Sequence, residues 1–537
     1  MGRLADFCML SFGWRRFALL FVAGALCGLT MPPFFSFPLL FVALPVWVWA
    51  LDGAESGTGV TKIFGAPFSI GFAFGLGYFL VSLHWIGAAF FVDGGWLIWV
   101  MPFAVLLVCA LLAIYWGLAS ALAHLFWSHG PGRIAVLALS LTLAEFLRGH
   151  LFTGFPFDLI GYSLTANTQM AQLASVTGVY GLGFLAVLLG ASTALIWPQD
   201  KRSAGVRLAP FFLAILFIAG QAGWGQYRLS GATANVDEGP LLRLVQPNID
   251  QRTKWQAESR AFVVDQLYTL SGARLGPEDK GIADKAALIW PESATPFYLP
   301  EAGDELARIS RLLADGQVLI TGAPRRDLVE DEAGASYNSV LAIGSDGAVS
   351  ASYDKTHLVP FGEYLPFRGL FSQLGLTQFV PGSDGWEAGE TRRVLALEGL
   401  PGFLPLICYE AIFSGDILEG TSPDALLNLT NDGWFDGSIG PAQHFHHARM
   451  RTIEEGLAMV RVANSGISGV VDGYGRTTAM LSQGEPGVLD VRVPPKLGAT
   501  FYSKYRNWPL FWLLVGGFAV LGGLTLRGRR PAGLFGG

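Results

Sequence analysis

The chain has 537 residues, of which 52% are hydrophobic and 15% charged, and its formal net charge is −6 at pH 7. This length allows more than one domain, and the apolar content is too high for an ordinary soluble protein. The negative charge and the lack of a basic patch with interleaved aromatic residues argue against a nucleic-acid-binding protein. Three of the four cysteines, Cys8, Cys27 and Cys109, lie in or beside apolar segments, too far along the chain from Cys408 to suggest a disulfide framework. No CxxC or Cys/His cluster predicts a metal site.

Eight apolar runs are long enough, or nearly so, to cross a bilayer of roughly 30 Å. The first two are short and the fourth is overlong; they lie near 16–31, 35–51, 65–86, 97–126, 133–149, 171–197, 208–225 and 507–526. Arg15 and Arg16 before the first run are also typical of a cleaved signal peptide. However, Leu26 stands where a cleavage site needs a small residue, so we expect an uncleaved membrane anchor.

The distribution of basic residues predicts the orientation of these runs. With the N-terminus in the cytoplasm, most of the basic residues near the runs fall on the inner side: Arg3, Arg15, Arg16, Lys62, Arg133, Lys201, Arg202, Arg207, Arg527, Arg529 and Arg530. We therefore predict seven spans in residues 1–225, an extracytoplasmic domain in 226–506, and a last span with a cytoplasmic tail in 507–537. Arg148 is an exception at the outer side, and we expect it to form a local ion pair with Glu145, with a lipid headgroup contact as the alternative.

The polar segment 226–506 alternates short β-rich runs with amphipathic stretches. The β-rich runs include LLRLVQPNI, AALIWPES, GQVLITGAP, YNSVLAIG, FLPLICYE and DALLNLTND, and helix-like stretches lie near 255–273, 302–315 and 440–456. Continuous apolar strands indicate sheets that are covered on both faces. We therefore predict an α/β sandwich for this segment.

Three places in this segment carry residues suited to catalysis. Glu292 follows the run LIWP, Lys355 and His357 follow the run AVSASYD, and Cys408 ends the run FLPLIC. Functional residues often lie at strand ends on a rigid scaffold. Taken singly, each residue also has a simple structural explanation, because a strand-end charge is usually a solvated surface group and a buried cysteine usually behaves as a small hydrophobe.

Together, the order Glu…Lys…Cys, each after an apolar strand, resembles the nitrilase (carbon–nitrogen hydrolase) superfamily. The motifs WPESATPF, YDKTHLVPFGEYLPF, ICYE and NLTNDGWFDGSIGPAQHFHHARMRTIE resemble more closely the apolipoprotein N-acyltransferase family of bacterial inner membranes. The resemblance covers the whole chain, with departures in loops such as 231–240 and 328–335. It implies a membrane bundle of about eight spans and a periplasmic, nitrilase-like α-β-β-α sandwich inserted before the last span.

The resemblance also implies roles for individual residues. Cys408 is the nucleophile, Glu292 is the base that takes its proton, and Lys355 is the cation that favours the thiolate and stabilises the oxyanion. Four further residues are supporting candidates: Glu363, Glu410, Tyr409 and Asn338. Five aromatic residues are candidates for lipid binding: Trp255, Trp434, Phe361, Tyr364 and Phe371. The last three belong to the stretch 360–382, for which we expect a mobile lid, with a helix packed on the core as the alternative. No metal or other cofactor is expected.

The function implied by the resemblance is the transfer of a fatty acyl chain from a membrane phospholipid to the α-amino group of the diacylglyceryl-cysteine of an apolipoprotein. The expected partners are therefore the phospholipid, the diacylated apolipoprotein and the bilayer. At roughly 0.8 kcal/mol per CH₂, drawing a chain of about sixteen carbons into water would cost about 12 kcal/mol, so a membrane-bound enzyme suits this reaction. Two alternatives stay open: a membrane-tethered amidase or nitrilase acting on a small C–N substrate, and a non-enzymatic transporter or receptor.

Overall fold

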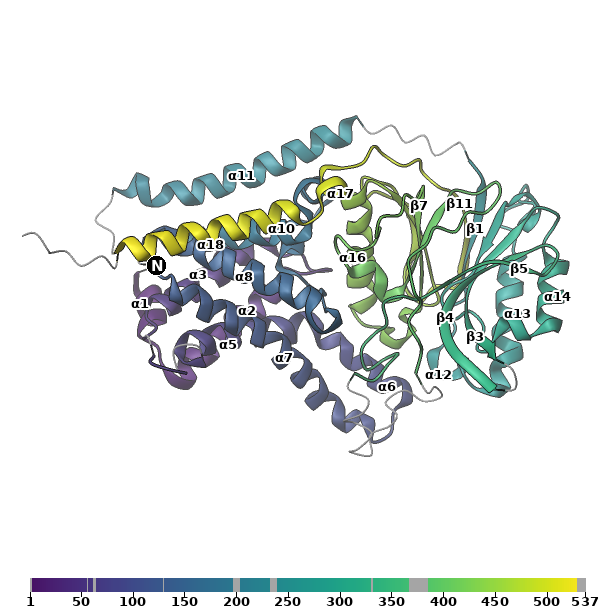
Figure 1. The fold of residues 1–537 in the computed structure, drawn as a ribbon, viewed down its shortest axis with the longest axis horizontal. Coiled ribbons are helices and arrows are strands. Elements are labelled where there is room, and N and C mark those ends of the chain that lie inside the picture. The colour runs from purple at the N-terminus through teal and green to yellow at the C-terminus, as the bar shows by residue number, and fades with distance from the viewer. Residues whose placement is uncertain are drawn as a thin grey trace, which may run out of the picture. The chain divides into compact units, whose positions relative to one another are not determined.

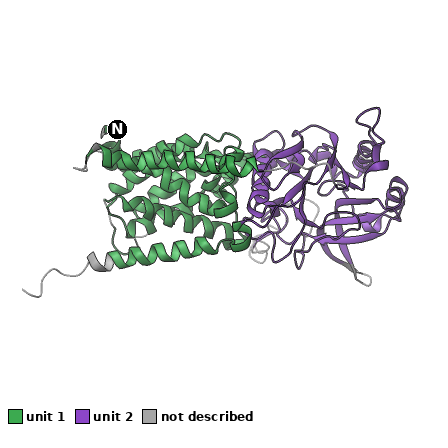
Figure 2. Cartoon of the chain, turned by 90° about the horizontal axis from the view of Figure 1, so that it is seen from above, with its two compact units in different colours: residues 1–87, 96–231, 501–537 green, residues 88–95, 232–500 purple. Residues whose placement is uncertain are grey.

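The computed structural model describes residues 2–55, 57–60, 64–128, 130–196, 203–231, 239–329, 332–366 and 385–528. These residues form two units, coloured separately in Figure 2. The first unit is helical and comprises Met1–Gly87, Trp96–Gly231 and Phe501–Gly537. The second unit contains all the described strands and comprises Ala88–Gly95 and Ala232–Thr500.

The helical unit is built from apolar helices connected by short turns (Figure 1). Its α-helices are α1 (Gly2–Leu10), α2 (Gly13–Gly28), α3 (Leu40–Asp52), α5 (Ala66–Leu83), α7 (Leu97–Leu125), α8 (Gly132–His150), α9 (Thr168–Ala171), α10 (Ala174–Gly190), α11 (Ala204–Ser230), α17 (Phe501–Tyr505) and α18 (Trp508–Gly528). Its 3₁₀ segments include η1 (Phe37–Leu39), η3 (Leu151–Thr153), η4 (Ile160–Leu164) and η5 (Ala191–Ile196).

Within the described part of the chain, five helical segments are long and apolar enough to cross a membrane: Ala66–Val92, Leu97–Leu125, Gly132–Thr153, Ala174–Ile196 and Gly205–Ser230. The apolar segments Phe37–Asp52 and Trp508–Leu524 are shorter, and α2 has 16 residues. A helix that spans a bilayer at right angles needs about 20 residues. Length and composition therefore support five of the eight predicted spans.

Glycines allow three of these helices to approach one another closely. A Cβ atom on Gly24 of α2 would lie 1.9 Å from the main-chain oxygen of Phe74 in α5, and one on Gly71 of α5 would lie 2.3 Å from that of Trp116 in α7. Contacts of this kind are typical of membrane helices, whose association depends on close van der Waals packing. By contrast, α7 and α11 expose many apolar side chains, such as Leu107 and Leu216, on their outer surfaces.

The predicted ion pair between Glu145 and Arg148 is confirmed. Arg148 Nη2 lies 2.9 Å from Glu145 Oε1, and both side chains are buried. Arg148 also donates to the main-chain oxygens of Phe155 and Phe157 at 2.6 and 2.8 Å. The pair therefore ties the end of α8 to the segment that follows it.

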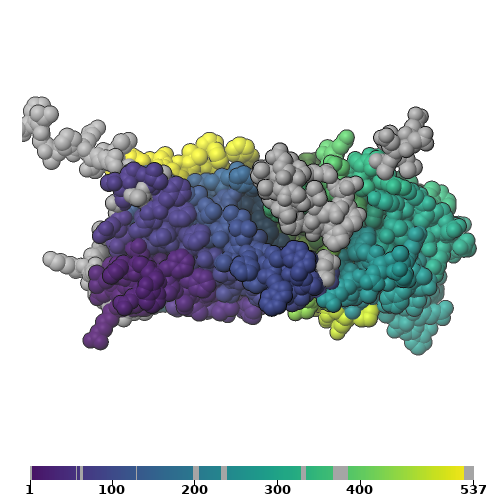
Figure 3. All heavy atoms as spheres, turned by 90° about the horizontal axis from the view of Figure 1, so that it is seen from below, coloured from purple at the N-terminus to yellow at the C-terminus, as the bar shows by residue number. Residues whose placement is uncertain are grey.

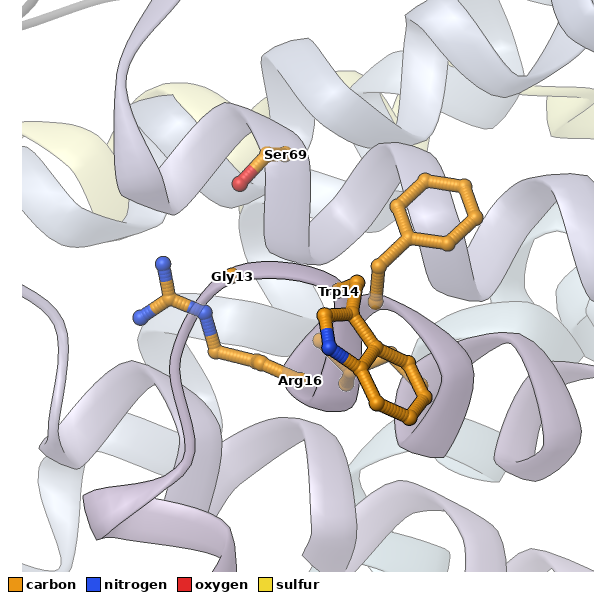
Figure 4. Close-up of a pocket in the computed structure, with 6 residues that line it drawn as sticks. Gly13, Trp14, Arg16 and Ser69 are labelled. Atoms are coloured by element: carbon orange, nitrogen blue, oxygen red, sulfur yellow. The ribbon is translucent and has the colours of Figure 1, made fainter.

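A cavity of about 320 Å³ lies at the start of α2 (Figure 4). It is lined by Gly13, Trp14, Arg16, Phe17, Leu20 and Ser69. Arg16 and Ser69 supply polar side chains, and the Ser69 hydroxyl donates to the main-chain oxygen of Ala66 at 2.9 Å. The remaining lining is largely apolar.

The second unit contains two sheets. Its strands are β1 (Leu241–Gln246), β2 (Ala287–Ile289), β3 (Val318–Val329), β4 (Glu332–Gly344), β5 (Val349–Asp354), β6 (Phe403–Ile407), β7 (Ala425–Thr430), β8 (Ala458–Ala463), β9 (Ser468–Val471), β10 (Thr477–Leu481) and β11 (Gly487–Arg492). Its main helices are α12 (Gln251–Lys254), α13 (Arg260–Ser271), α14 (Gly303–Leu312) and α16 (Gly440–Glu455), with α6 (Phe90–Asp93) from the earlier part of the chain. The three predicted helix-like stretches correspond to α13, α14 and α16.

Both sheets follow the same plan. The described strands of the first sheet run in the order β11-β1-β2-β3-β4-β5, and those of the second in the order β10-β9-β8-β7-β6. In each sheet three consecutive strands pair in parallel, β1-β2-β3 and β6-β7-β8, and two antiparallel strands follow at one side. Parallel strands end at the same edge of their sheet, so this plan brings several strand ends together.

The apolar strands are buried on both faces, as their sequence predicts. Between the sheets lies a cluster that includes Leu244, Ile289, Leu427 and Val460. Side chains at alternate strand positions form two outer clusters, one containing α13 and α14 residues and the other containing Ala448 of α16. The unit is therefore an α-β-β-α sandwich. In the space-filling view of Figure 3, the part of the chain that carries β1 to β5 is drawn in teal to green, and the first helices of the chain are drawn in purple and blue.

Candidate active site

The three residues expected to carry catalysis each follow a strand of the sandwich. Glu292 comes three residues after the end of β2, Lys355 directly follows β5, and Cys408 directly follows β6, where it begins the 3₁₀ segment η9 (Cys408–Ile412). Lys355 Nζ lies 3.7 Å from Glu292 Oε1, and Glu410, two residues after Cys408, accepts the main-chain N–H of Thr356 beside Lys355 at 2.9 Å. The structure therefore brings the ends of strands from both sheets to one place.

Glu292, Lys355, Glu363 and Asn338 form one hydrogen-bonded cluster. Lys355 Nζ donates to Glu363 Oε1 at 2.8 Å and lies 3.7 Å from Glu292 Oε1. The Asn338 side-chain amide donates to Glu292 Oε1 at 2.8 Å and to Glu363 Oε1 at 3.1 Å. Among the described residues, no side chain donates to Glu292 Oε2, so this oxygen is available to accept a proton.

Glu410 is fully buried and accepts hydrogen bonds from two loops. Its Oε2 takes the main-chain N–H of Ile407 at 2.7 Å, just before Cys408. Its Oε1 accepts four hydrogen bonds from the end of β5 and the loop after it. The donors are Tyr353 Oη at 2.9 Å, Thr356 N at 2.9 Å, Thr356 Oγ1 at 2.8 Å and His357 N at 3.1 Å. Arg392 lies 3.7 Å from Oε1. Glu410 thus joins the loop that carries Lys355 to the turn that carries Cys408.

Cys408 has an unusual backbone conformation, with φ of +49°. Few residues other than glycine adopt this left-handed region, and such strain is typical of functional positions. His444 of α16 holds the Cys408 main-chain oxygen through Nε2 at 3.0 Å, and its Nδ1 lies 2.8 Å from Asp432 Oδ1. Arg461 of β8 donates to Asp432 Oδ2 at 2.8 Å. These buried polar groups therefore hold the main chain of Cys408 in its strained conformation.

The electrostatic environment keeps the Cys408 thiol protonated at rest. Burial raises its pKa most, the negative charge of Glu292 raises it further, and Lys355 lowers it. Burial also raises the pKa of Glu292, while Lys355 lowers it. Burial lowers the pKa of Lys355, but Glu363 and Glu292 more than compensate, so the net shift is upward and the ammonium stays charged. Since the thiolate is the nucleophilic form, the thiol needs a neighbouring base at the moment of attack.

The aromatic candidates for lipid binding differ in how far their side chains are exposed. Trp255 follows α12 and is 45% exposed, and Phe361 is 53% exposed. Trp434 and Tyr364 are half-buried. Tyr409 is buried, and its ring packs edge-on against Phe413 with the centroids 5.1 Å apart. Phe371 and most of the predicted lid lie outside the described residues.

Sequence reasoning missed several residues that the fold brings to this site. Asp432 and His444 lie within the motif at 428–454 and Arg461 lies just beyond it, yet their mutual contacts depend on β7, α16 and β8 packing together. Lys254 is fully buried beside Glu292 and was not singled out either. The sequence carries no spacing rule for such contacts, because the partners come from different elements.

Cys408, Asp432 and His444 also satisfy the geometry of a three-ligand metal group. One ligand atom from each lies within 4.8 Å of the others. However, the two ring nitrogens of His444 already face Asp432 and the Cys408 main-chain oxygen. The set is therefore better described as a hydrogen-bonded support for Cys408 than as a metal centre.

Known proteins resemble both parts of the chain. Residues 23–192 match the family described as "Apolipoprotein N-acyltransferase N-terminal domain", and residues 243–501 match "Carbon-nitrogen hydrolase".

Full-length relatives carry the same name. The chain is 41% identical to an apolipoprotein N-acyltransferase from Rhodopseudomonas palustris, with 99% of each chain covered. It is 44% identical to one from Bradyrhizobium diazoefficiens, with 98% of each covered, and 40% identical to one from Brucella suis, with 99% of each covered. The chain therefore belongs to the apolipoprotein N-acyltransferase family, whose members are acyltransferases of the carbon–nitrogen hydrolase superfamily.

Proposed function

We propose that the protein transfers a fatty acyl chain from a membrane phospholipid to the α-amino group of the diacylglyceryl-cysteine of an apolipoprotein, through a thioester on Cys408. The observation that carries this proposal is the cluster of Glu292, Lys355 and Glu363, which Glu410 joins to the turn that holds the Cys408 thiol. A carboxylate, an ammonium and a thiol in this arrangement supply a base, an oxyanion partner and a nucleophile.

In the first half-reaction, Glu292 takes the Cys408 proton and the sulfur attacks the ester carbonyl of the phospholipid. Lys355 stabilises the negative charge on the carbonyl oxygen of the tetrahedral intermediate. The carbon–oxygen ester bond then breaks, and the leaving oxygen of the lysophospholipid takes the proton from Glu292. Cys408 is left carrying the acyl chain as a thioester.

In the second half-reaction, the acceptor amine attacks the thioester carbonyl. Glu292 takes the proton from the amine nitrogen, the carbon–sulfur bond breaks, and an amide forms. The proton returns from Glu292 to the Cys408 sulfur, so the enzyme regains its starting state. The two products leave in separate steps, which predicts ping-pong kinetics.

The supporting residues act on these groups. Glu363 and Asn338 orient Lys355 and Glu292, and Glu410 joins the loop of Lys355 to the turn of Cys408; the hydrogen bonds of these residues support these roles. Tyr409 packs beside the turn that holds Cys408. Trp255, Trp434, Phe361, Tyr364 and Phe371 contact lipid, a role supported by the exposure of Trp255 and Phe361.

The helical part supports a reaction at a membrane. We infer that residues 1–225 cross the bilayer seven times, that residues 226–506 form the periplasmic catalytic domain, and that residues 507–537 add the last span and a cytoplasmic tail. The five long apolar helices support this organisation, and the excess of Lys and Arg in the predicted inner loops supports the orientation. Because the family is bacterial, the inner membrane is the expected location.

A membrane-tethered amidase is the second candidate, because it would need the same thiol, base and cation. The full-length family relationship and the apolar helices favour a lipid substrate instead. An amidase also has no need for an amine acceptor.

Mass spectrometry after incubation with phospholipid tests the proposal. Purified protein in detergent should gain the mass of one acyl chain on the peptide that carries Cys408, and Cys408→Ala should gain none. A diacylated lipopeptide with a free α-amino group should then remove the adduct, whereas the same lipopeptide with an acetylated amine should not. An adduct that water discharges at the same rate without the amine would favour the amidase.

A further inference from the structure

Lys254 is a buried lysine beside the proposed base. It ends the short helix α12 and is 0% exposed. Its ammonium makes one hydrogen bond among the described residues, donating to the main-chain oxygen of Glu292 at 3.5 Å. Buried charges in proteins are normally paired, so an ammonium with a single long contact to a carbonyl calls for a nearby negative charge.

The surrounding carboxylates indicate which charge Lys254 balances. Glu410 has Arg392 at 3.7 Å, and Asp432 has Arg461 at 2.8 Å. Glu292 and Glu363 share the single ammonium of Lys355, at 3.7 and 2.8 Å. Without another cation, this group of three would carry a net negative charge in a buried site, and Glu292 would tend to hold a proton.

We propose that Lys254 is a positioning residue for Glu292: it holds the main chain of Glu292 and supplies the second positive charge that keeps the carboxylate ionised. With Lys254 included, the charges of two ammoniums balance those of two carboxylates. The inference deepens the proposed function, because it rests on Glu292 being the base that takes the Cys408 proton.

Electrostatics supports this arrangement. Burial lowers the pKa of Lys254 from 10.5 to about 8, while Glu292 raises it, so the ammonium persists at neutral pH. Conversely, Lys254 is among the groups that lower the pKa of Glu292 against the effect of burial. The two groups therefore stabilise each other's charged forms.

A rigid support holds Lys254 in place. The Asp250 side chain caps α12 by accepting the main-chain N–H groups of Arg252 and Thr253. Gln251 accepts from the Asn431 side chain at 2.9 Å, and the Asn464 side chain donates to the main-chain oxygen of Ile249 at 2.8 Å. The segment before Lys254 is thus anchored to the ends of β7 and β8. Trp255, the exposed neighbour of Lys254, lies on the same anchored segment.

The pH dependence of Cys408 alkylation tests the proposal in the full-length protein. The probe is iodoacetamide, and the readout is the rate at which the Cys408 peptide gains the carbamidomethyl group from about pH 5 to about pH 9. The acid limb of this profile is the pH range in which the alkylation rate rises as Glu292 ionises. Lys254→Gln should move this acid limb upward by about one pH unit and slow alkylation about tenfold below it. Lys254→Arg, which keeps the charge, should retain the wild-type acid limb. Lys280→Gln, at an exposed lysine, is the matched control and should match wild type.

A double variant separates charge balance from a loss of packing. Adding Glu363→Gln to Lys254→Gln removes one negative charge, so the acid limb should return toward lower pH. A purely structural role for Lys254 predicts no such return. An acid limb in Lys254→Gln that coincides with the wild-type limb, or a double variant that shows no return, overturns the inference. If Lys254→Gln does not fold, Lys254→Met takes its place, since its side chain has a similar length and fills the same apolar volume.

Glu292→Gln distinguishes this inference from the proposed function. If Glu292→Gln leaves the alkylation profile unchanged, Glu292 is not the base and the proposed function fails with it. If Glu292→Gln abolishes the acid limb but Lys254→Gln does not move it, only the role of Lys254 is wrong.

Discussion

Glu410 accepts the main-chain N–H of Ile407 at 2.7 Å, so the carboxylate two residues after Cys408 holds the residue just before it. The other oxygen of the same carboxylate binds the loop after β5, which begins with Lys355. One buried side chain therefore sets the spacing between the two strand ends on which Lys355 and Cys408 lie. This relationship makes Glu410 a structural determinant of the site.

Glu410→Gln should destabilise the protein substantially. The amide cannot accept on both of its polar atoms, and Arg392 loses its buried partner. Removing one partner of a buried charge pair typically costs about 3 kcal/mol or more. The midpoint of thermal unfolding in detergent should fall by several degrees, whereas Glu398→Gln, at an exposed position, should leave it unchanged. Equal midpoints for the two variants would mean that Glu410 does not stabilise these loops.

Glu363→Gln should impair catalysis more than stability. Glu363 holds Lys355 at 2.8 Å and also accepts the main-chain N–H of Val359 at 2.9 Å. Without its charge, Lys355 is less firmly placed for the oxyanion, and a misplaced oxyanion donor typically costs about 100-fold in kcat. Single-turnover acylation of Cys408 by phospholipid measures this step directly.

Glu363→Gln should also change the pH dependence of the reaction. Because Glu363 raises the pKa of Glu292, its neutralisation should move the acid limb of the rate profile to lower pH while the plateau falls. The exposed Glu387→Gln serves as the control. A plateau rate within about twofold of the wild-type rate would show that Glu363 does not position the catalytic groups.

The sequence was sufficient to find residues at or just beyond the ends of strong strands. Glu292, Lys355 and Cys408 each come after an apolar run, and in the fold these runs are β2 and β5 of the first sheet and β6 of the second. The contact between His444 and Asp432 was not predictable, because it joins α16 to the loop after β7. Lys254 escaped notice for a related reason: its burial results from tertiary packing, and lysine in a short polar stretch normally indicates a surface.

The number of membrane spans could not be predicted from hydropathy alone. Hydropathy marks apolar runs but does not show where a helix ends within them. The first run forms only the 16 residues of α2, and the next helix, α3, has 13 residues. Pro32, Pro33 and Pro38 lie between them, and proline lacks the N–H that a continuing helix needs. By contrast, the overlong fourth run forms a single helix, α7, of 29 residues.

Close packing at Gly24 predicts a sharp difference between two glycine substitutions. Gly24→Ala would place a methyl group 1.9 Å from the main-chain oxygen of Phe74, so α2 and α5 must move apart. Gly220→Ala in α11 meets nothing within 4 Å and removes a residue of poor helix propensity. In detergent, Gly24→Ala should therefore lower the thermal midpoint and the yield of folded protein, and Gly220→Ala should not. Similar midpoints for both variants would contradict the close contact between α2 and α5.

Asp432 should make the protein sensitive to strong acid. Burial raises the pKa of this carboxyl, but Arg461 and His444 lower the pKa by more than burial raises it. The net shift is therefore downward, from 3.8 to about 2. A depressed native pKa means that the ionised group stabilises the fold fully above pH 3.8 and loses this contribution as the pH falls through about 2. The contribution amounts to about 2 kcal/mol.

Asp432→Asn tests this sign. The variant should be less stable than wild type near pH 5, because Arg461 and His444 lose their charged partner, and the difference should shrink as the pH falls toward 2. Asp436→Asn, at an exposed position, should follow the wild-type curve throughout. Since His444 also holds the main-chain oxygen of Cys408, Asp432→Asn should slow Cys408 alkylation at neutral pH as well. A variant that loses acid sensitivity but retains wild-type alkylation would show that Asp432 stabilises the fold without fixing the strained cysteine.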